Sequence, residues 1–418
     1  MKSFHKFGLL VIFFVWSASL LSQVTSQWRG IERNGIYAET NLLTSWPVPG
    51  PALLWENGNI GNGYGSPTIT GDRIYICGEI DTTGYLFAFD HKGTLMWKSA
   101  YGNEWVLNYQ GARCAPTVAG DLVYVSSGLG NIACFDAKNG ERKWSVDMQK
   151  DLHGRFTLFG HAESLLVDGD KVFLVPGGMD TNVVAFNRFT GKIIWICKGQ
   201  GEIPGYNSPY MIRLPERNVL VTFSAYSMLG IDAKTGELLW THNQVNIPVA
   251  ERKPGNGDTH SNTILYENGF IYYIAGDGNG AVKLELSGDG KQIRQIWRNK
   301  GIDNYMGGFV KIGNYLYSCV SEKKKLVSID ANSGQVVDSL KVGTGTIIFS
   351  DGLLYYYNQK GDMDLVKPDQ GKLKLISSFR ITAGTKEHFS HPVIHDGVLY
   401  IRHGKALQAY SIKKNKPQ

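Results

Sequence analysis

The stretch that decides the fold is 115–144, APTVAGDLVYVSSGLGNIACFDAKNGERKW. It contains four short runs of apolar, β-branched and aromatic residues, and turns at Gly120-Asp121, 127–131 and Lys138-Asn139-Gly140 separate them. Such alternation predicts four antiparallel strands joined by hairpins. One four-stranded sheet cannot bury both of its faces, so the rest of the chain must supply neighbouring sheets.

The same pattern recurs along the 418-residue chain, and each unit closes on an aromatic or apolar residue. Neighbouring closing residues are 39 to 57 positions apart, which suits the four-stranded blade of a β-propeller. Helical repeats of this length would show apolar residues at 3.6-residue spacing instead. The closing residues are Trp97, Trp144, Trp195, Trp240, Trp297, Leu340 and Phe379.

A last unit, 391–412, stops after three strands, while a single strand around Ala52–Glu56 with Trp55 has no hairpin partner of its own. Letting this N-terminal strand complete the C-terminal blade closes the ring and removes its exposed edges. The predicted fold class is therefore all-β: one domain, 27–418, that forms an eight-bladed β-propeller of four-stranded antiparallel blades.

The N-terminus carries a targeting pattern. Lys2 and Lys6 precede an apolar run, 8–21, and small residues around Ser26 follow it. This predicts a secretory signal peptide over 1–26. The run is shorter than the ~20 residues of a membrane anchor, and no cysteine follows it for lipid attachment. We expect export to the periplasm or beyond, with no transmembrane segment.

Charge and cysteine content narrow the possible partners. The net charge of +6 lies partly in the leader and partly in the C-terminal tail, so no basic stripe suggests nucleic acid. The five cysteines are widely spaced within apolar strands, which favours buried free thiols over a disulfide framework. A pairing of Cys114 with Cys134 inside one blade stays open.

Two segments carry a family resemblance. Asp136–Trp144 (DAKNGERKW) and Asp232–Trp240 (DAKTGELLW) resemble the tryptophan-docking repeat of the PQQ-like, quinoprotein-type propellers. The early pattern Trp28-Arg29-Gly30 is similar to exported members. The family includes quinoprotein alcohol dehydrogenases and the outer-membrane assembly factor BamB, so the resemblance implies the propeller fold and leaves the activity open. The repeat's Trp would pack between blades, where its Gly permits a turn.

The first strand of each propeller blade lines the axis, so the residues that open these strands should surround one mouth of a central funnel. Seven of the eight are small, and His391 is the exception. The opening residues are Ser66, Ala115, Ser164, Ser208, Ser261, Gly308, Thr346 and His391. One position earlier, three successive blades carry the polar side chains of Glu163, Asn207 and His260. Together with polar neighbours in the sequence, these side chains could bind a cation or a polar ligand. The predicted ligand-binding residues are Arg113, His161, Glu163, Tyr206, Asn207, His260 and His391.

The resemblance also implies an enzyme alternative. Quinoprotein dehydrogenases hold Ca²⁺ against PQQ with a Glu and an Asn, and they use an Asp as base. Glu163, Asn207 and Asp258 supply these residue types in order, the first two as metal ligands and the third as the catalytic base. The chain lacks, however, the adjacent Cys-Cys pair and the long inserts found in many of these enzymes.

The interpretation we favour is a non-catalytic binding or scaffold module without a cofactor, which takes a protein partner or a small polar ligand at the funnel mouth in the cell envelope. A PQQ- and Ca²⁺-dependent alcohol or sugar dehydrogenase is the first alternative. Tyr101, Trp105 and Tyr109, in the loop between the first two blades, leave open a carbohydrate-binding propeller as the second.

Overall fold

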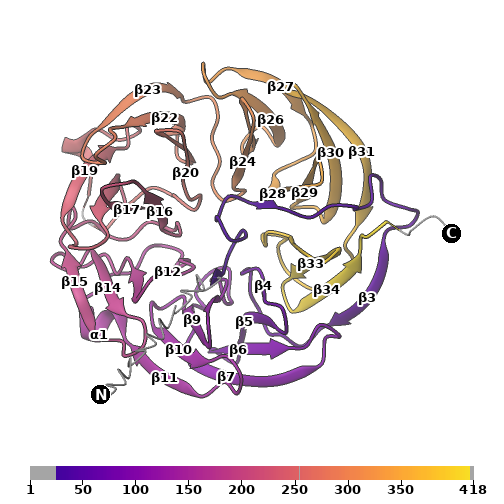
Figure 1. Ribbon diagram of the computed structural model, residues 1–418, viewed down its shortest axis with the longest axis horizontal. Coiled ribbons are helices and arrows are strands. Elements are labelled where there is room, and N and C mark those ends of the chain that lie inside the picture. The colour runs from indigo at the N-terminus through magenta and orange to yellow at the C-terminus, as the bar shows by residue number, and fades with distance from the viewer. Residues whose placement is uncertain (1–24, 254, 415–418) are drawn as a thin grey trace, which may run out of the picture.

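The computed structural model describes residues 25–253 and 255–414. Eight sheets stand side by side around a central axis, in chain order around the ring (Figure 1). The predicted eight-bladed propeller of four-stranded antiparallel blades is confirmed. Within the described ranges, helix is confined to α1 (Met148–Leu152) and a 3₁₀ turn at Val249–Glu251.

The strands of each blade follow one another from the axis outward. Blades 1 and 2 comprise β4 (Thr68–Ile69), β5 (Ile74–Ile80), β6 (Thr83–Phe89) and β7 (Leu95–Asn103), then β8 (Thr117–Ala119), β9 (Leu122–Ser126), β10 (Ile132–Asp136) and β11 (Arg142–Val146). Blades 3 and 4 comprise β12 (Leu166–Asp168), β13 (Lys171–Leu174), β14 (Val183–Asn187) and β15 (Ile193–Cys197), then β16 (Tyr210–Arg213), β17 (Asn218–Phe223), β18 (Ser227–Asp232) and β19 (Leu238–Asn243).

The second half of the ring repeats this arrangement. Blades 5 and 6 comprise β20 (Leu265–Glu267), β21 (Phe270–Ala275), β22 (Gly280–Leu286) and β23 (Ile293–Asn299), then β24 (Phe309–Ile312), β25 (Tyr315–Val320), β26 (Lys325–Asp330) and β27 (Val336–Leu340). Blade 7 comprises β28 (Gly345–Ser350), β29 (Leu353–Asn358), β30 (Asp362–Asp369) and β31 (Lys372–Arg380), and blade 8 contains β32 (Val393–His395), β33 (Val398–His403) and β34 (Ala406–Ser411).

The ring closes as the sequence predicted. Strand β3 (Ala52–Asn57) pairs antiparallel with β34 and becomes the outermost strand of blade 8, with Trp55 opposite Ala409. The indole N–H of Trp55 donates to the carbonyl of His91 in blade 1, at 2.9 Å. The orphan strand therefore completes its own blade and also docks that blade on the first one.

The docking repeat acts between blades, as the resemblance implied. The indole Nε1 of Trp144 donates to the carbonyl of Arg188 in the next blade, at 2.9 Å. Gly191 of that blade lies against the indole ring, where a Cβ would come within 2.8 Å of it, and its φ is +69°. Glycine is favoured here because it has no Cβ to clash with the indole and adopts a positive φ without strain. The repeat thus serves packing rather than ligand binding.

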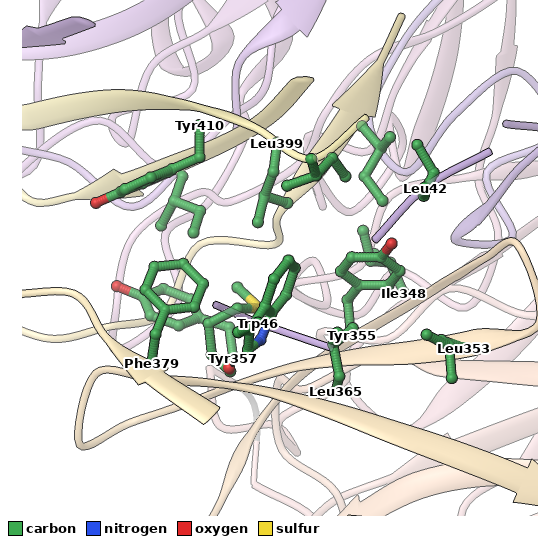
Figure 2. Close-up of a cluster of buried hydrophobic side chains, with 14 of the residues drawn as sticks. Leu42, Trp46, Ile348, Leu353, Tyr355, Tyr357, Leu365, Phe379, Leu399 and Tyr410 are labelled. Atoms are coloured by element: carbon green, nitrogen blue, oxygen red, sulfur yellow. Dashed lines mark hydrogen bonds between the residues drawn. The ribbon is translucent and has the colours of Figure 1, made fainter. Parts of the chain in front are cut away.

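The N-terminal segment also fills the gap between blades 7 and 8, where blade 7 closes on Phe379 instead of a tryptophan. Trp46 inserts there among buried aromatic and aliphatic side chains (Figure 2). Its Nε1 donates to the carbonyl of Met363 at 2.8 Å, and its ring meets Tyr355 and Phe379 edge-on. A remote segment thus completes a blade interface.

The segment before Trp46 crosses the axis, a feature that the sequence did not predict. Strand β1 (Thr25–Ser26) adds to the inner edge of blade 2, and β2 (Ile36–Tyr37) runs parallel to the inner strand of blade 7. Figure 1 shows this indigo segment at the centre of the ring and then passing outward between blades 7 and 8. Residues 25–37, here named the axial plug, therefore lie across the central channel.

Two arginines anchor the axial plug, and both are 2% exposed. Arg29 donates to the carbonyls of Phe309 and Ile347 in blades 6 and 7, at 2.5 and 3.2 Å. Arg33 donates to carbonyls of blade 3 and of the segment that enters blade 4. Carbonyl oxygens at the axis thus solvate two buried guanidinium groups on opposite sides of the ring.

The predicted leader, 1–26, falls mostly outside the described residues; its last two residues form strand β1. Across the parts of the chain that the structure describes, no helix combines the length and the apolar character that crossing a membrane requires.

Candidate functional site

A cavity of about 570 Å³ occupies the channel mouth where the loops enter the inner strands. Four predicted opening residues with hydroxyl side chains, Ser66, Ser164, Ser208 and Ser261, line it. Trp28 of the axial plug lines the same cavity. We call this cavity the funnel. Because the axial plug lies across the channel, the funnel is closed at its base.

Three of the four funnel serines form hydrogen bonds between neighbouring blades. Ser66 donates to the carbonyl of His391 at 2.8 Å, which links blade 1 to blade 8. Ser164 Oγ accepts from the backbone N–H of Ala115, and Ser208 Oγ accepts from that of Ser164, both at 2.9 Å. Small hydroxyl residues therefore occur here because they fit the crowded axis and pair its backbone groups.

Aromatic rings form a continuous arc along the funnel wall. Tyr64 meets Phe389 with ring centroids 5.5 Å apart, and Phe389 meets Tyr109 at 5.9 Å. Tyr109 then meets Phe159, and Phe159 meets Tyr206, also at 5.9 Å. We call these five residues the aromatic arc. The arc presents ring faces and edges drawn from the loops of five blades.

Charged groups of both signs complete the wall. Arg113 lines the funnel and donates to the carbonyls of Asn108, Tyr109 and Gly111 at 2.8 Å, so its guanidinium also holds the loop that carries Tyr109. Burial lowers the pKa of Arg113. Asp277 lines the funnel from a hairpin of blade 5 and accepts from the backbone N–H of Thr259.

His391 lines the funnel beside the axial plug. Its ring meets Trp28 at 5.3 Å and 88°, and it is 6% exposed. Burial and the nearby Arg29 charge hold the pKa of His391 well below its usual range. The imidazole is therefore neutral at physiological pH, and its role in ligand binding stays a prediction.

The residues one position before the opening residues do not line the funnel, apart from Gly65, which has no side chain. Glu163 Oε2 accepts from the backbone N–H of Val175 at 3.0 Å, and Asn207 Oδ1 accepts from that of Phe223 at 3.2 Å. Each side chain thus ties the start of its blade to the second strand of that blade.

The other two histidines predicted for the site, His161 and His260, are buried as well. His260 stacks on Phe223 at 4.9 Å, and its Nε2 lies 3.1 Å from the carbonyl oxygen of Ala225. His161 is 2% exposed. Burial lowers the pKa of both histidines to about 4, so both are neutral. Of the seven predicted ligand-binding residues, the structure brings Arg113, Tyr206 and His391 together at the funnel.

Asp258, predicted as a catalytic base, lines a neighbouring pocket of about 650 Å³, and Tyr206 lies in the wall common to both cavities. The Asp258 carboxylate accepts hydrogen bonds from the side-chain amides of Asn246 and Asn279 at 2.6 and 3.0 Å. Burial raises the pKa of Asp258. The Oδ2 atom lies 3.9 Å from Nε2 of His260.

The residues predicted for calcium do not fit a calcium–quinone site in this arrangement. Burial raises the pKa of Glu163 to about 8, although Arg33 nearby acts in the opposite direction. A protonated carboxyl is a poor ligand for Ca²⁺, and the Asn207 oxygen already accepts a backbone hydrogen bond. Within 25–253 and 255–414, no group of three His, Cys, Asp or Glu side chains is placed to hold a metal ion.

Two of the three loop aromatics considered for sugar stacking are buried instead. The Tyr101 hydroxyl donates to Glu104 at 2.5 Å, and Trp105 Nε1 donates to Asn108 at 2.9 Å. Tyr101 lies in β7 and packs in the core between blades 1 and 2, whereas Trp105 packs in the loop that follows; both are at most 6% exposed. Tyr109, 48% exposed, is the member of this group that lines the funnel.

The sequence did contain a signal for the funnel wall, two positions before each opening residue. An extended chain turns alternate side chains to the same side, so these residues share the axial side with the opening residues. In seven of the eight blades this position lines the funnel. The seven residues are Tyr64, Arg113, Ala162, Tyr206, Thr259, Met306 and Phe389.

Together, the eight blades, the tryptophan docking and the funnel define a PQQ-like repeat propeller. A family model described as outer membrane protein assembly factor BamB matches residues 82–340, and the chain belongs to this family.

Relatives by sequence divide between two kinds of protein. The chain is 24% identical over 229 residues to the quinoprotein alcohol dehydrogenase PedH of Pseudomonas putida, a match covering 51% of this chain and 33% of that protein. It is 23% identical over 269 residues to the outer membrane protein assembly factor BamB of Shewanella oneidensis, covering 62% and 63%. Each match spans less than two thirds of the relative.

Solved structures share the fold. BamB from Moraxella catarrhalis superposes with a TM-score of 0.61 at 12% identity, over 85% of this chain and 96% of that one. A europium-containing methanol dehydrogenase superposes with a TM-score of 0.64 at 12% identity, over 91% and 90%. The propeller is thus common to an assembly factor and to an enzyme, and the fold leaves the activity open.

Proposed function

We propose that this protein is an exported, non-catalytic binding or scaffold propeller of the cell envelope, and that the funnel is its binding site. The observation that carries the proposal is the aromatic arc above a closed base. Five rings supply apolar faces, and Arg113 and Asp277 supply one charge of each sign at the wall. A cavity of about 570 Å³ accepts a small polar ligand or the tip of a partner's loop.

The chemistry of the funnel side chains supports binding over catalysis. Two of the serine hydroxyls accept hydrogen bonds from backbone N–H groups, which leaves them in structural roles. The Arg113 guanidinium is held by three carbonyls of its own loop. Stacking and hydrogen bonding to a ligand need no activated nucleophile or base, and these side chains suit that task.

A quinoprotein dehydrogenase that uses PQQ and Ca²⁺ is the first alternative, favoured by the similarity to PedH. In such an enzyme Glu163 and Asn207 would have to hold the metal ion, and each would first have to exchange its present backbone partner. A carbohydrate-binding propeller is the second alternative, favoured by the aromatic arc, because sugar rings stack on aromatic faces.

Catalysis is tested with the purified protein, PQQ and CaCl₂, followed by ethanol or glucose and a redox dye. The proposal expects no dye reduction at any cofactor concentration. Dye reduction that depends on both PQQ and Ca²⁺ would overturn it in favour of the dehydrogenase.

The place of binding is tested in cells that export the protein, with a photo-crosslinking residue in place of Tyr109. The matched control replaces Phe189, an aromatic residue 54% exposed in the hairpin between β14 and β15, at the opposite end of blade 3. The proposal expects adducts from position 109 alone. Equal adducts from both positions, or none from position 109, would contradict the funnel as the binding site. On a glycan array, any signal should be lost in Tyr109→Ala and kept in Phe189→Ala.

A further inference from the structure

Two cysteine side chains meet beside the funnel wall. Cys77 lies in β5 of blade 1, and Cys114 lies just before β8 of blade 2. Their Sγ atoms are 3.6 Å apart, and the two residues are 0% and 1% exposed. Cys134, which the sequence left open as a partner of Cys114, lies in β10, where it pairs with Tyr124 and Trp144 on the neighbouring strands.

We propose that Cys77 and Cys114 form a disulfide bond that joins blades 1 and 2 when the protein folds under oxidising conditions. Sulfur atoms 3.6 Å apart are in van der Waals contact, whereas a disulfide needs about 2.05 Å. Each sulfur therefore has to move by less than about 1 Å, which small rotations about the two Cα–Cβ bonds provide.

The position of the pair gives the bond a structural purpose. Arg402 of blade 8 donates to the carbonyls of Cys77 and Gly65, at 2.6 and 3.1 Å. The chain at Gly65 passes so close to Cys114 that a Cβ there would lie 2.0 Å from its carbonyl oxygen. The disulfide thus lies where blade 8, blade 1 and blade 2 meet, next to the seam at which the ring closes, and Cys114 directly follows Arg113 of the funnel.

The reaction needs an oxidant, and a thiol–disulfide oxidoreductase or oxidised glutathione supplies it. One cysteine thiolate attacks the oxidant's disulfide and forms a mixed disulfide, and the second thiolate then displaces the oxidant's sulfur. The two thiols lose two protons and two electrons in total, and the oxidant's disulfide is reduced to two thiols. Because both sulfurs are buried in the folded ring, the exchange takes place during folding, before blades 1 and 2 have docked.

The test refolds the purified full chain in a glutathione redox buffer with a disulfide isomerase, denatures it under acid quench and alkylates the free thiols. The expected product has three alkylated cysteines of the five, and protease digestion releases a peptide that links Cys77 to Cys114. Five alkylated cysteines, or a link between any other pair, would overturn the proposal. Since the oxidant is added in vitro, the result does not depend on the proposed export or on the funnel's ligand.

Matched variants separate the bond from general effects of substitution. Cys77→Ala should leave four alkylated cysteines and Cys134→Ala two, because only the first removes a bonded partner. Closing a loop of about 38 residues raises the Tm of a chain of this length by about 5 °C. Dithiothreitol should therefore lower the Tm of the wild type and of Cys134→Ala by that amount, and it should leave the Tm of Cys77→Ala unchanged. Equal Tm shifts in all three proteins would contradict the proposal.

Discussion

Replacement of Arg33 tests whether the axial plug is part of the folded core. Its guanidinium donates to the carbonyls of Ser164 and Pro209 at 3.0 and 3.2 Å, to the carbonyl of Leu165, and to the side chain of Gln27 at 2.7 Å. In Arg33→Ala, the buried carbonyls of Ser164 and Pro209 lose their donor, whereas the Leu165 carbonyl still accepts from the Thr117 hydroxyl at 2.6 Å. The variant should unfold more easily, and the plug should open first.

The size of the effect follows from these contacts. Each buried carbonyl left without a partner costs about 1–3 kcal/mol. The variant no longer has to bury a guanidinium, whose pKa burial lowers to about 9, and this offsets part of the loss. We expect a net loss of about 3 kcal/mol, which for a domain of about 390 residues lowers the Tm by about 4 °C.

The assay is differential scanning calorimetry, with hydrogen exchange to locate the opening. Arg213→Ala is the control, because Arg213 is 63% exposed and forms a surface ion pair with Asp168 at 2.7 Å. Its loss should cost at most about 1 kcal/mol. Arg33→Lys keeps the positive charge but lacks the planar guanidinium that reaches several carbonyls at once. Its decrease in Tm should lie between those of Arg33→Ala and Arg213→Ala. A Tm of Arg33→Ala within about 1 °C of the wild type, or equal losses in Arg33→Ala and Arg213→Ala, would refute the reasoning.

Three further predictions concern single side chains. The folded-state pKa of Glu163, about 8, lies above its ordinary value of about 4.5, so the folded protein keeps a proton that the unfolded chain releases. The stability of the protein should therefore fall as the pH rises between these values. Glu163→Gln should make the fall of Tm from pH 5 to pH 8 less steep. Identical slopes would contradict this account. Trp144→Ala removes the indole that packs on Gly191 and should lower the free energy of unfolding by about 3 kcal/mol, measured by thermal denaturation. A decrease below about 1 kcal/mol would show that tryptophan docking is not a main source of stability. Tyr109→Ala truncates a half-exposed side chain and should change stability by no more than about 0.5 kcal/mol, so a larger loss would mean that it supports the loop rather than a ligand.

The ring could be predicted from the sequence because its signals are local and repeated. Each blade carries its own turns and its own closing residue, and counting strands was enough to assign Ala52–Glu56 to the last blade. The axial plug carried no such signal. Two-residue strands have no periodicity, and Arg29 and Arg33 resemble solvated loop charges until the carbonyls around them are known.

In several blades the residues predicted from the sequence lie one position away from the residues that line the funnel. Glu163, Asn207 and His260 are polar, which favours the position directly before each opening residue, but polarity does not show which side of an extended chain faces the channel mouth. A shift of one residue along an extended chain turns a side chain to the other side. The structure accordingly turns Glu163 and Asn207 toward their own blades and His260 toward Phe223 of blade 4. The position before each of the three supplies Ala162, Tyr206 and Thr259 to the funnel.

The closing strand also sets the order of events during synthesis. β3 lies near the start of the chain and pairs with β34 near its end, so blade 8 cannot form until nearly the whole polypeptide is available. Contacts of such sequence separation form late and slowly. A chain still emerging from the ribosome therefore lacks its closed native state until its last strands are released.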